Sequence, residues 1–276
     1  MKLSIQRFSQ MRRRIWPDHT DRWRGLTYQY DLLRHLVWRD FSLRYKQSVL
    51  GILWSLVLPL AQLLVMVFLF QSVVPLNIEA YPAFVFCTLL PWGWFSSCVG
   101  SSGVLFTGSR DLVRHPNFAP LRLAIVNTLS NLITYLVALP ILMGVVVAYG
   151  RPITSALLLL PVLMLIQATM MIGLSLMIAT LNVFYRDVQH IVTVSLLLLF
   201  YLTPVFYRPQ SVVAKYHVVY QFNPVAVLIQ GYREIFFYGT SPDLGSLLFA
   251  AVASVVIYGL GALVYNYQQH NLIDTI

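Results

Sequence analysis

The sequence predicts an all-α integral membrane protein with six transmembrane helices, and two observations support this. Apolar residues make up 58% of the 276 residues and charged residues only 11%, whereas roughly 25% of an ordinary soluble domain is charged. The charged residues leave six charge-poor stretches, at 47–78, 80–109, 123–150, 152–185, 188–207 and 244–273. About 20 helical residues cross a bilayer, so each stretch accommodates one crossing. We expect spans at about 49–74, 83–106, 123–149, 155–181, 191–206 and 244–265.

The basic residues predict how these spans are oriented. With the N-terminus inside, 15 of the 19 lysine and arginine residues lie on the cytoplasmic side, and only Arg151, Arg208, Lys215 and Arg233 lie outside. Basic loops stay preferentially in the cytoplasm, so we expect a multi-pass protein with both termini cytoplasmic. This placement accounts for the net charge of +9 and gives no indication of a nucleic-acid partner.

Residues 1–27 are predicted to be a basic cytoplasmic tail, followed by a single domain at 28–276. The domain begins with an amphipathic helix at 28–46, in which polar residues recur on one face and apolar residues on the other. Asp40 and Arg44 fall on the apolar side, four residues apart, which predicts an ion pair. We expect this interface helix to lie in the membrane plane, in contact with membrane lipids.

The first two spans contain a group of aromatic residues. Trp54 lies early in the first span, and the second span contains Trp92, Trp94 and Phe95. Two interpretations of these rings remain open. They either pack against lipid and neighbouring helices, or they line a pore.

The residues between the second and third spans form an internal loop that includes a predicted short helix. Arg110, Asp111, Leu112 and Arg114 lie within it. The fourth span contains the small residues Gly173, Ser175 and Ala179, which permit close approach of another helix. It ends at a polar turn that contains Asn182, Tyr185, Arg186 and Asp187.

The stretch between the fifth and sixth spans, residues 206–240, is too apolar for a loop and too broken to cross a membrane. Asn223 and Pro224 provide the cap and first-turn proline of a helix, and Gly239 provides its end. We expect a pair of external helices that re-enter the outer leaflet.

Several kinds of chemistry have no residues to support them. The six predicted spans contain no charged residue, although an ion-coupled carrier usually keeps some. The sequence has no zinc-binding His-Glu-x-x-His motif and no nucleotide-binding Gly-Lys-Ser/Thr loop. We therefore expect no metal site, no catalytic site and an energy source on another chain.

Three separated segments resemble the permeases of bacterial ABC-2 type transporters, and more narrowly the branch that exports O-antigen, capsule and teichoic-acid polymers. They are Arg-Tyr-Lys-Gln-Ser-Val-Leu-Gly-Ile-Leu-Trp at 44–54, Leu-Leu-Pro-Trp-Gly-Trp-Phe at 89–95 and Asn-Val-Phe-Tyr-Arg-Asp-Val at 182–188. The third segment, with Asn182, Tyr185, Arg186 and Asp187, identifies the family, and we assign it no chemistry beyond a structural hinge.

The resemblance implies a homodimer that works with two ATPase subunits, which hold ATP and Mg. It implies that this chain needs no cofactor and that the complex exports a lipid-linked polysaccharide across the bacterial plasma (inner) membrane. It also implies that the helix with Arg110, Asp111, Leu112 and Arg114 couples the permease to the ATPase. The alternatives are an ABC-2 exporter of lipids or drugs and, from another class, a membrane-embedded acyl- or glycosyltransferase.

The cations of the interface helix suggest how a lipid-linked substrate enters. Arg34, Arg39, Arg44 and Lys46 lie at about the level of the inner headgroups, where a phosphate of the substrate would pass. Arginine suits phosphate because its guanidinium donates two hydrogen bonds at once. The alternative is that these cations contact only lipid headgroups or acidic residues of the ATPase.

Overall fold

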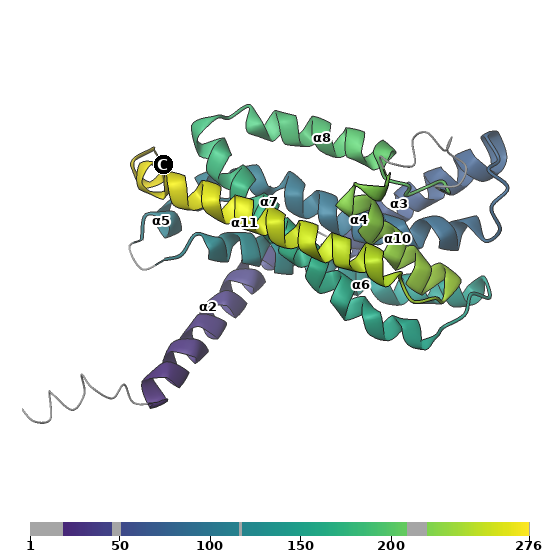
Figure 1. Ribbon diagram of the computed structural model, residues 1–276, viewed down its shortest axis with the longest axis horizontal. Helices are drawn as coiled ribbons and strands as arrows, with labels where there is room; N and C mark the ends of the chain where they lie inside the picture. Colours follow the sequence, from purple (N-terminus) through teal and green to yellow (C-terminus); the bar gives the residue numbers. More distant parts are fainter. Residues whose placement is uncertain (1–18, 46–50, 116–117, 209–219, 276) are drawn as a thin grey trace, which may run out of the picture.

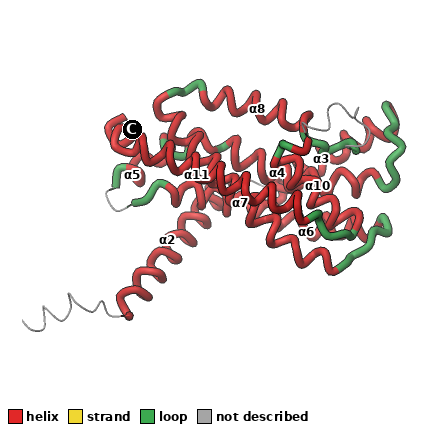
Figure 2. The backbone as a smooth tube through the Cα atoms, in the orientation of Figure 1, coloured by secondary structure: helices red, strands yellow, loops and turns green. Residues whose placement is uncertain are grey.

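The structure, a computed structural model, describes residues 19–45, 51–115, 118–208 and 220–275, and all regular elements in these ranges are helical (Figures 1 and 2). The long helices form a bundle, and the N-terminal helix α2 projects from one side of it (Figure 1). The principal helices are α2 (His19–Tyr45), α3 (Trp54–Phe68), α4 (Tyr81–Gly100), α5 (Arg110–Val113), α6 (Leu121–Ala148), α7 (Leu160–Phe184), α8 (Val188–Leu202), α10 (Pro224–Arg233) and α11 (Leu244–Thr275).

The bundle has two ends, which we name by a helix at each. The α5 end carries α5, the turn between α7 and α8, and the last turns of α11 (Figure 1). The α10 end carries α10 and the two turns at residues 74–80 and 149–154 (Figure 1).

Five helical segments in the described part of the chain are long and apolar enough to cross a membrane. They are Trp54–Val73, Tyr81–Val104, Leu121–Ala148, Ser155–Phe184 and Leu244–Leu272. The first includes a π-helical segment, Leu69–Val73, the second the 3₁₀ segment Ser102–Val104 and the fourth the 3₁₀ segment Ser155–Leu159. All five match predicted spans, because the charge-poor stretches end where polar turns begin.

Helix α8 is the exception to the predicted set of six spans. It has 15 residues, so at 1.5 Å per residue it extends for about 22 Å, less than the roughly 30 Å of a bilayer core. Thr203 and Pro204 follow it, and the chain turns back there toward the bundle. The sequence predicted a span of nearly this length at 191–206, and the observed helix begins three residues earlier and ends four residues earlier.

Helix α2 begins at His19, earlier than the boundary at residue 28 expected from the sequence. Its apolar side contacts α6, and Leu36 and Phe41 are buried there. Most of the helix extends away from the bundle, and its C-terminal turns make the contact (Figure 1). The helix thus extends through Gly25, in a segment predicted to be part of the tail.

The core lies around α4, which is apolar on all sides. It belongs to the most deeply buried span, in which 78% of the residues of the apolar 18-residue stretch are buried. Helix α7 contacts α4 and packs closely against α11. At their crossing, a Cβ on Gly173 would overlap the backbone of Tyr258, and a Cβ on Gly261 would overlap the backbone of Gly173. The prediction that Gly173 permits close helix approach is confirmed.

The predicted helix after Asn223 is confirmed as α10. The Asn223 side chain accepts hydrogen bonds from the backbone N–H groups of Val225 and Ala226, at 3.0 and 3.3 Å. A π-helical segment, Glu234–Tyr238, continues α10 and ends at Gly239, whose φ is +66°. The other helix of the expected pair falls largely at 209–219, outside the described residues.

Candidate functional site

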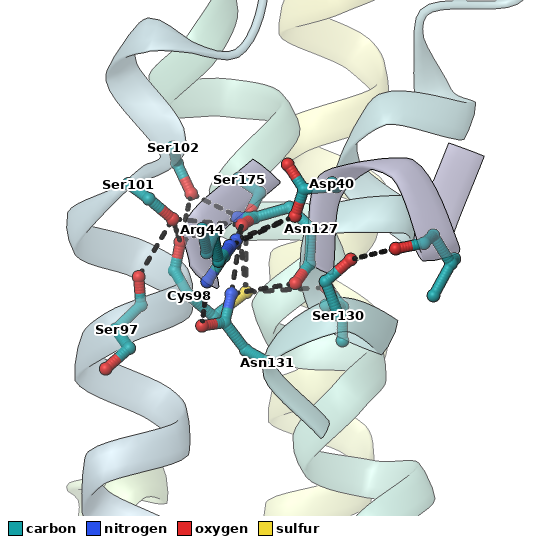
Figure 3. A network of polar contacts seen from close by, with 12 residues as sticks. Asp40, Arg44, Ser97, Cys98, Ser101, Ser102, Asn127, Ser130, Asn131 and Ser175 are labelled. Carbon is teal, nitrogen blue, oxygen red and sulfur yellow. Dashed lines mark hydrogen bonds and ion pairs between the residues drawn. The ribbon is translucent and has the colours of Figure 1, made fainter. Parts of the chain in front are cut away.

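Arg44 ties the end of α2 to the bundle. It forms an ion pair with Asp40 at 3.0 Å, which confirms the predicted i,i+4 pair. Its guanidinium also donates hydrogen bonds to the side-chain oxygens of Asn131, at 2.7 Å, and Asn127, at 3.2 Å, both on α6 (Figure 3). The Arg44 side chain, 31% exposed, is therefore held between a carboxylate of its own helix and two amides of another.

Asn127 extends this contact to α4. Its Oδ1 accepts a hydrogen bond from the hydroxyl of Ser101, at 2.9 Å, and its Nδ2 donates to the backbone oxygen of Cys98, at 2.8 Å (Figure 3). Asn131 in turn donates to the Asn127 side chain at 3.0 Å. Buried polar groups must find partners, so these bonds fix α2, α4 and α6 relative to one another.

A cavity of about 300 Å³ lies beside Arg44, between α3, α4 and α6. We call it the Arg44 cavity. Trp54 is half exposed, so the cavity reaches the molecular surface at α3. Aromatic rings, hydroxyl groups and amides line it together with the guanidinium, and the lining includes Trp54, Gln62, Trp92, Trp94, Ser97 and Asn131. The structure thus brings the three predicted tryptophans together with Arg44, one of the four predicted cations.

The predicted aromatic residues have different surroundings. Trp94 is buried against Tyr135, with ring centroids 5.5 Å apart, and its indole N–H donates to the backbone oxygen of Thr128. Trp92 packs on Phe95, is largely buried and is one of the residues that line the cavity. Phe95 is buried in the core and does not line the cavity. A role of these rings in a pore stays a prediction.

The other predicted entry cations lie apart from the cavity. Arg34 and Arg39 are exposed on α2 and do not line the Arg44 cavity. Arg34 lines a separate groove between α2 and α6, together with His35 and Trp38. Lys46 lies outside the described residues. Of the three cations that the structure describes, only Arg44 lines the Arg44 cavity.

The predicted short helix in the internal loop is present as α5. Val113, the last residue of α5, is buried in an apolar cluster around Phe106. Leu112 packs partly against the same cluster. Arg110, Asp111 and Arg114 are exposed. Helix α5 is therefore anchored by its apolar side and presents charged side chains outward at the α5 end.

Asn182 of the predicted polar turn makes two contacts that join helices. Its Nδ2 donates to the backbone oxygen of Gly103, at 2.8 Å, and its Oδ1 accepts from the backbone N–H of Gln189, at 3.2 Å. Gln189 also donates to the backbone oxygen of Gly100, at 2.8 Å. The turn between α7 and α8 is thereby attached to the end of α4, from which the chain leads into α5. Tyr185, Arg186 and Asp187 are exposed and make no comparable contact.

Sequence reasoning missed one buried cation, Arg233 at the end of α10. Its guanidinium donates to the backbone oxygens of Pro204 and Val205, at 2.5 and 2.8 Å, and lies 4.0 Å from the ring centre of Phe84. Burial lowers the pKa of Arg233, while the carbonyls stabilise its charged form. A signal was present, because Arg233 follows Tyr232 and Ile229 on the apolar face of the predicted helix.

The sequence also concealed Asn127 and Asn131. Two amides four residues apart on an apolar span share one helix face, and polar residues in a span usually contact other helices.

In the described part of the chain, no group of three His, Cys, Asp or Glu side chains is arranged to hold a metal ion. What the site provides is a cation, aromatic faces and hydrogen-bonding groups.

Comparison with known proteins places this arrangement in a family. Residues 31–237 match the model of the ABC-2 type transporter family. The chain is 35% identical over 253 residues to the O-antigen export system permease protein RfbA of Myxococcus xanthus, covering 90% of this chain and 97% of the relative. A Klebsiella pneumoniae protein of the same name is 30% identical over 91% of this chain and 97% of its own length. The polysialic acid transport protein KpsM of Escherichia coli is 23% identical over 91% of this chain and 98% of its own. The chain therefore belongs to the ABC-2 type transporter family, as a membrane permease and not an enzyme.

Proposed function

We propose that this permease exports a lipid-linked polysaccharide, of the O-antigen, capsule or teichoic-acid type, across the bacterial inner membrane. The observation that carries the proposal is the match to O-antigen export permeases over about nine-tenths of the chain. The Arg44 cavity supports it, because aromatic faces and hydroxyl or amide groups suit sugars and a guanidinium suits phosphate.

The proposed complex has two permease copies and two ATPase subunits, which bind ATP and Mg. Each permease crosses the membrane six times, with α8 and the residues after it as the fifth crossing, and both termini lie in the cytoplasm. The basic residues support this orientation, since it leaves only four of them outside. The α5 end is then the cytoplasmic end, and α10 re-enters the outer leaflet.

Helix α5 is the proposed contact with the ATPase. Its exposed Arg110, Asp111 and Arg114 provide a charged surface, and the buried Val113 holds that surface firmly to the bundle. The attachment of α8 to the end of α4 by Asn182 supports a path by which movement of α5 reaches the spans.

The proposal is tested by reconstituting the permease and its ATPase in proteoliposomes with a fluorescent lipid-linked oligosaccharide. We expect ATP-dependent movement of the sugar to the opposite leaflet, measured by its accessibility to a membrane-impermeant lectin. A complex that moves a fluorescent phospholipid equally well, and the sugar no better, would contradict the polysaccharide assignment.

A further inference from the structure

The two kinds of partner around Arg44 differ in their effect on its charge. Asn127 and Asn131 accept hydrogen bonds at 3.2 and 2.7 Å but are neutral. They therefore orient the guanidinium toward the cavity without cancelling its charge. Asp40 is ionised and lies 3.0 Å away, so it neutralises the cation. The Arg44 cavity contains a positioned arginine whose charge is offset by a single neighbouring carboxylate.

Asp40 is well placed to release Arg44. Its side chain is 37% exposed and lies one turn earlier on the same helix. A change in its side-chain rotamer would separate the two groups without movement of the backbone. The ion pair is also weakly held, because ion pairs that water can reach contribute little to stability. A diphosphate that links a sugar to a lipid carries two negative charges, one more than a carboxylate, and can bind the guanidinium through two parallel hydrogen bonds.

The cavity has the size and lining of a site for a single headgroup. Its volume of about 300 Å³ is at the lower end of the roughly 300–1,000 Å³ typical of small-molecule sites. Trp54 and Trp92 offer apolar ring surface, and Gln62, Ser97 and Asn131 offer hydrogen-bonding groups. This lining suits a sugar ring attached to the phosphate better than an acyl chain.

We propose that the Arg44 cavity binds the phosphate-linked first sugar of a glycolipid, and that Asp40 is a displaceable counter-ion that competes with the phosphate for Arg44. The inference rests on the proposed export of a lipid-linked polysaccharide and adds a binding site and its regulation to it. Asp40 then keeps the site electrically neutral until a stronger anion arrives. Weak anions are rejected, because they cannot displace the carboxylate.

The proposal predicts effects of opposite sign for the two members of the pair. Asp40→Asn keeps the size of the side chain and an acceptor for Arg44 but removes the competing charge, so binding should tighten about two- to fivefold. Arg44→Gln removes the cation, so binding should weaken about tenfold or more. A purely structural pair that fastens α2 to α6 would weaken binding in both variants. Asp31→Asn, the same exchange at an exposed position of α2, is the matched control and should change nothing.

The test uses the full-length permease in detergent without nucleotide, with quenching of tryptophan fluorescence as the readout. The probes are geranyl diphosphate linked to N-acetylglucosamine, geranyl diphosphate alone, and dioctanoyl phosphatidylglycerol. Opposite shifts of the dissociation constant with the sugar-bearing probe, and weaker binding of the other two, would establish the proposal.

Three results would overturn it. Loss of binding in both variants would assign the pair a structural role. Equal binding of phosphatidylglycerol would make the cavity a phospholipid site. Absence of binding by the wild-type chain would remove the site altogether, while ATP-dependent export in proteoliposomes would still test the proposed function separately.

Discussion

Replacing Asn182 by alanine should loosen the turn between α7 and α8 from the end of α4. Asn182 is 7% exposed and makes two hydrogen bonds between segments, to the Gly103 oxygen and from the Gln189 N–H. A buried hydrogen bond contributes about 1 kcal/mol net, so the loss of both should cost about 2 kcal/mol. A loss of that size corresponds to a fall of roughly 4–8 °C in the midpoint of thermal unfolding, at about 2–4 °C per kcal/mol.

The measurement is the loss of soluble permease after heating in detergent, followed by size-exclusion chromatography. Asn182→Asp keeps the acceptor for Gln189 but loses the donor to Gly103, so it should lower the midpoint by at least half as much. Thr193→Ala is the control, because Thr193 is exposed and its hydroxyl bonds only within α8. A midpoint for Asn182→Ala equal to that of the control would refute the claim that these bonds hold α8 to α4.

Three further predictions concern other parts of the chain. Reversing the two exposed basic charges in and just after α5 with Arg110→Glu and Arg114→Glu should abolish ATP-dependent export at normal membrane levels of permease. Export at the wild-type rate would exclude α5 as the ATPase contact. Gly173→Ala should cost about 1–3 kcal/mol, because its methyl group overlaps α11. Gly144→Ala has open space around it inside α6 and should leave the unfolding midpoint unchanged or slightly raised, because alanine favours a helix. The isolated permease should neither bind nor hydrolyse ATP in an equilibrium binding and phosphate-release assay, and saturable nucleotide binding would contradict the two-chain arrangement.

The sequence was sufficient to locate the membrane spans, because charged residues are too costly to leave in lipid and so mark the ends of each crossing. It was less successful where backbone geometry decides the outcome. The polar segment before residue 28 continues α2 back to His19. The start of this helix does not coincide with a change in charge or in apolar content.

The candidate site was predicted only in its local part. The pair of Asp40 and Arg44 follows from helical spacing, but its partners on α6 are more than 80 residues away in the sequence. The orientation of the second span was also hidden, because α4 is apolar all round and offers no polar stripe to distinguish one face from another. Packing against neighbouring helices therefore decides that Trp94 is buried in the core, and a single sequence does not contain that information.

The contact of Arg233 has a consequence for how this protein tolerates mutation. Its two oxygen partners belong to the main chain of Pro204 and Val205, and every amino acid provides the same carbonyl. Substitution at either position leaves the acceptor in place as long as the backbone keeps its course. Loss of the arginine removes both hydrogen bonds at once, so this contact depends on the identity of Arg233 and only on the backbone of its two partners.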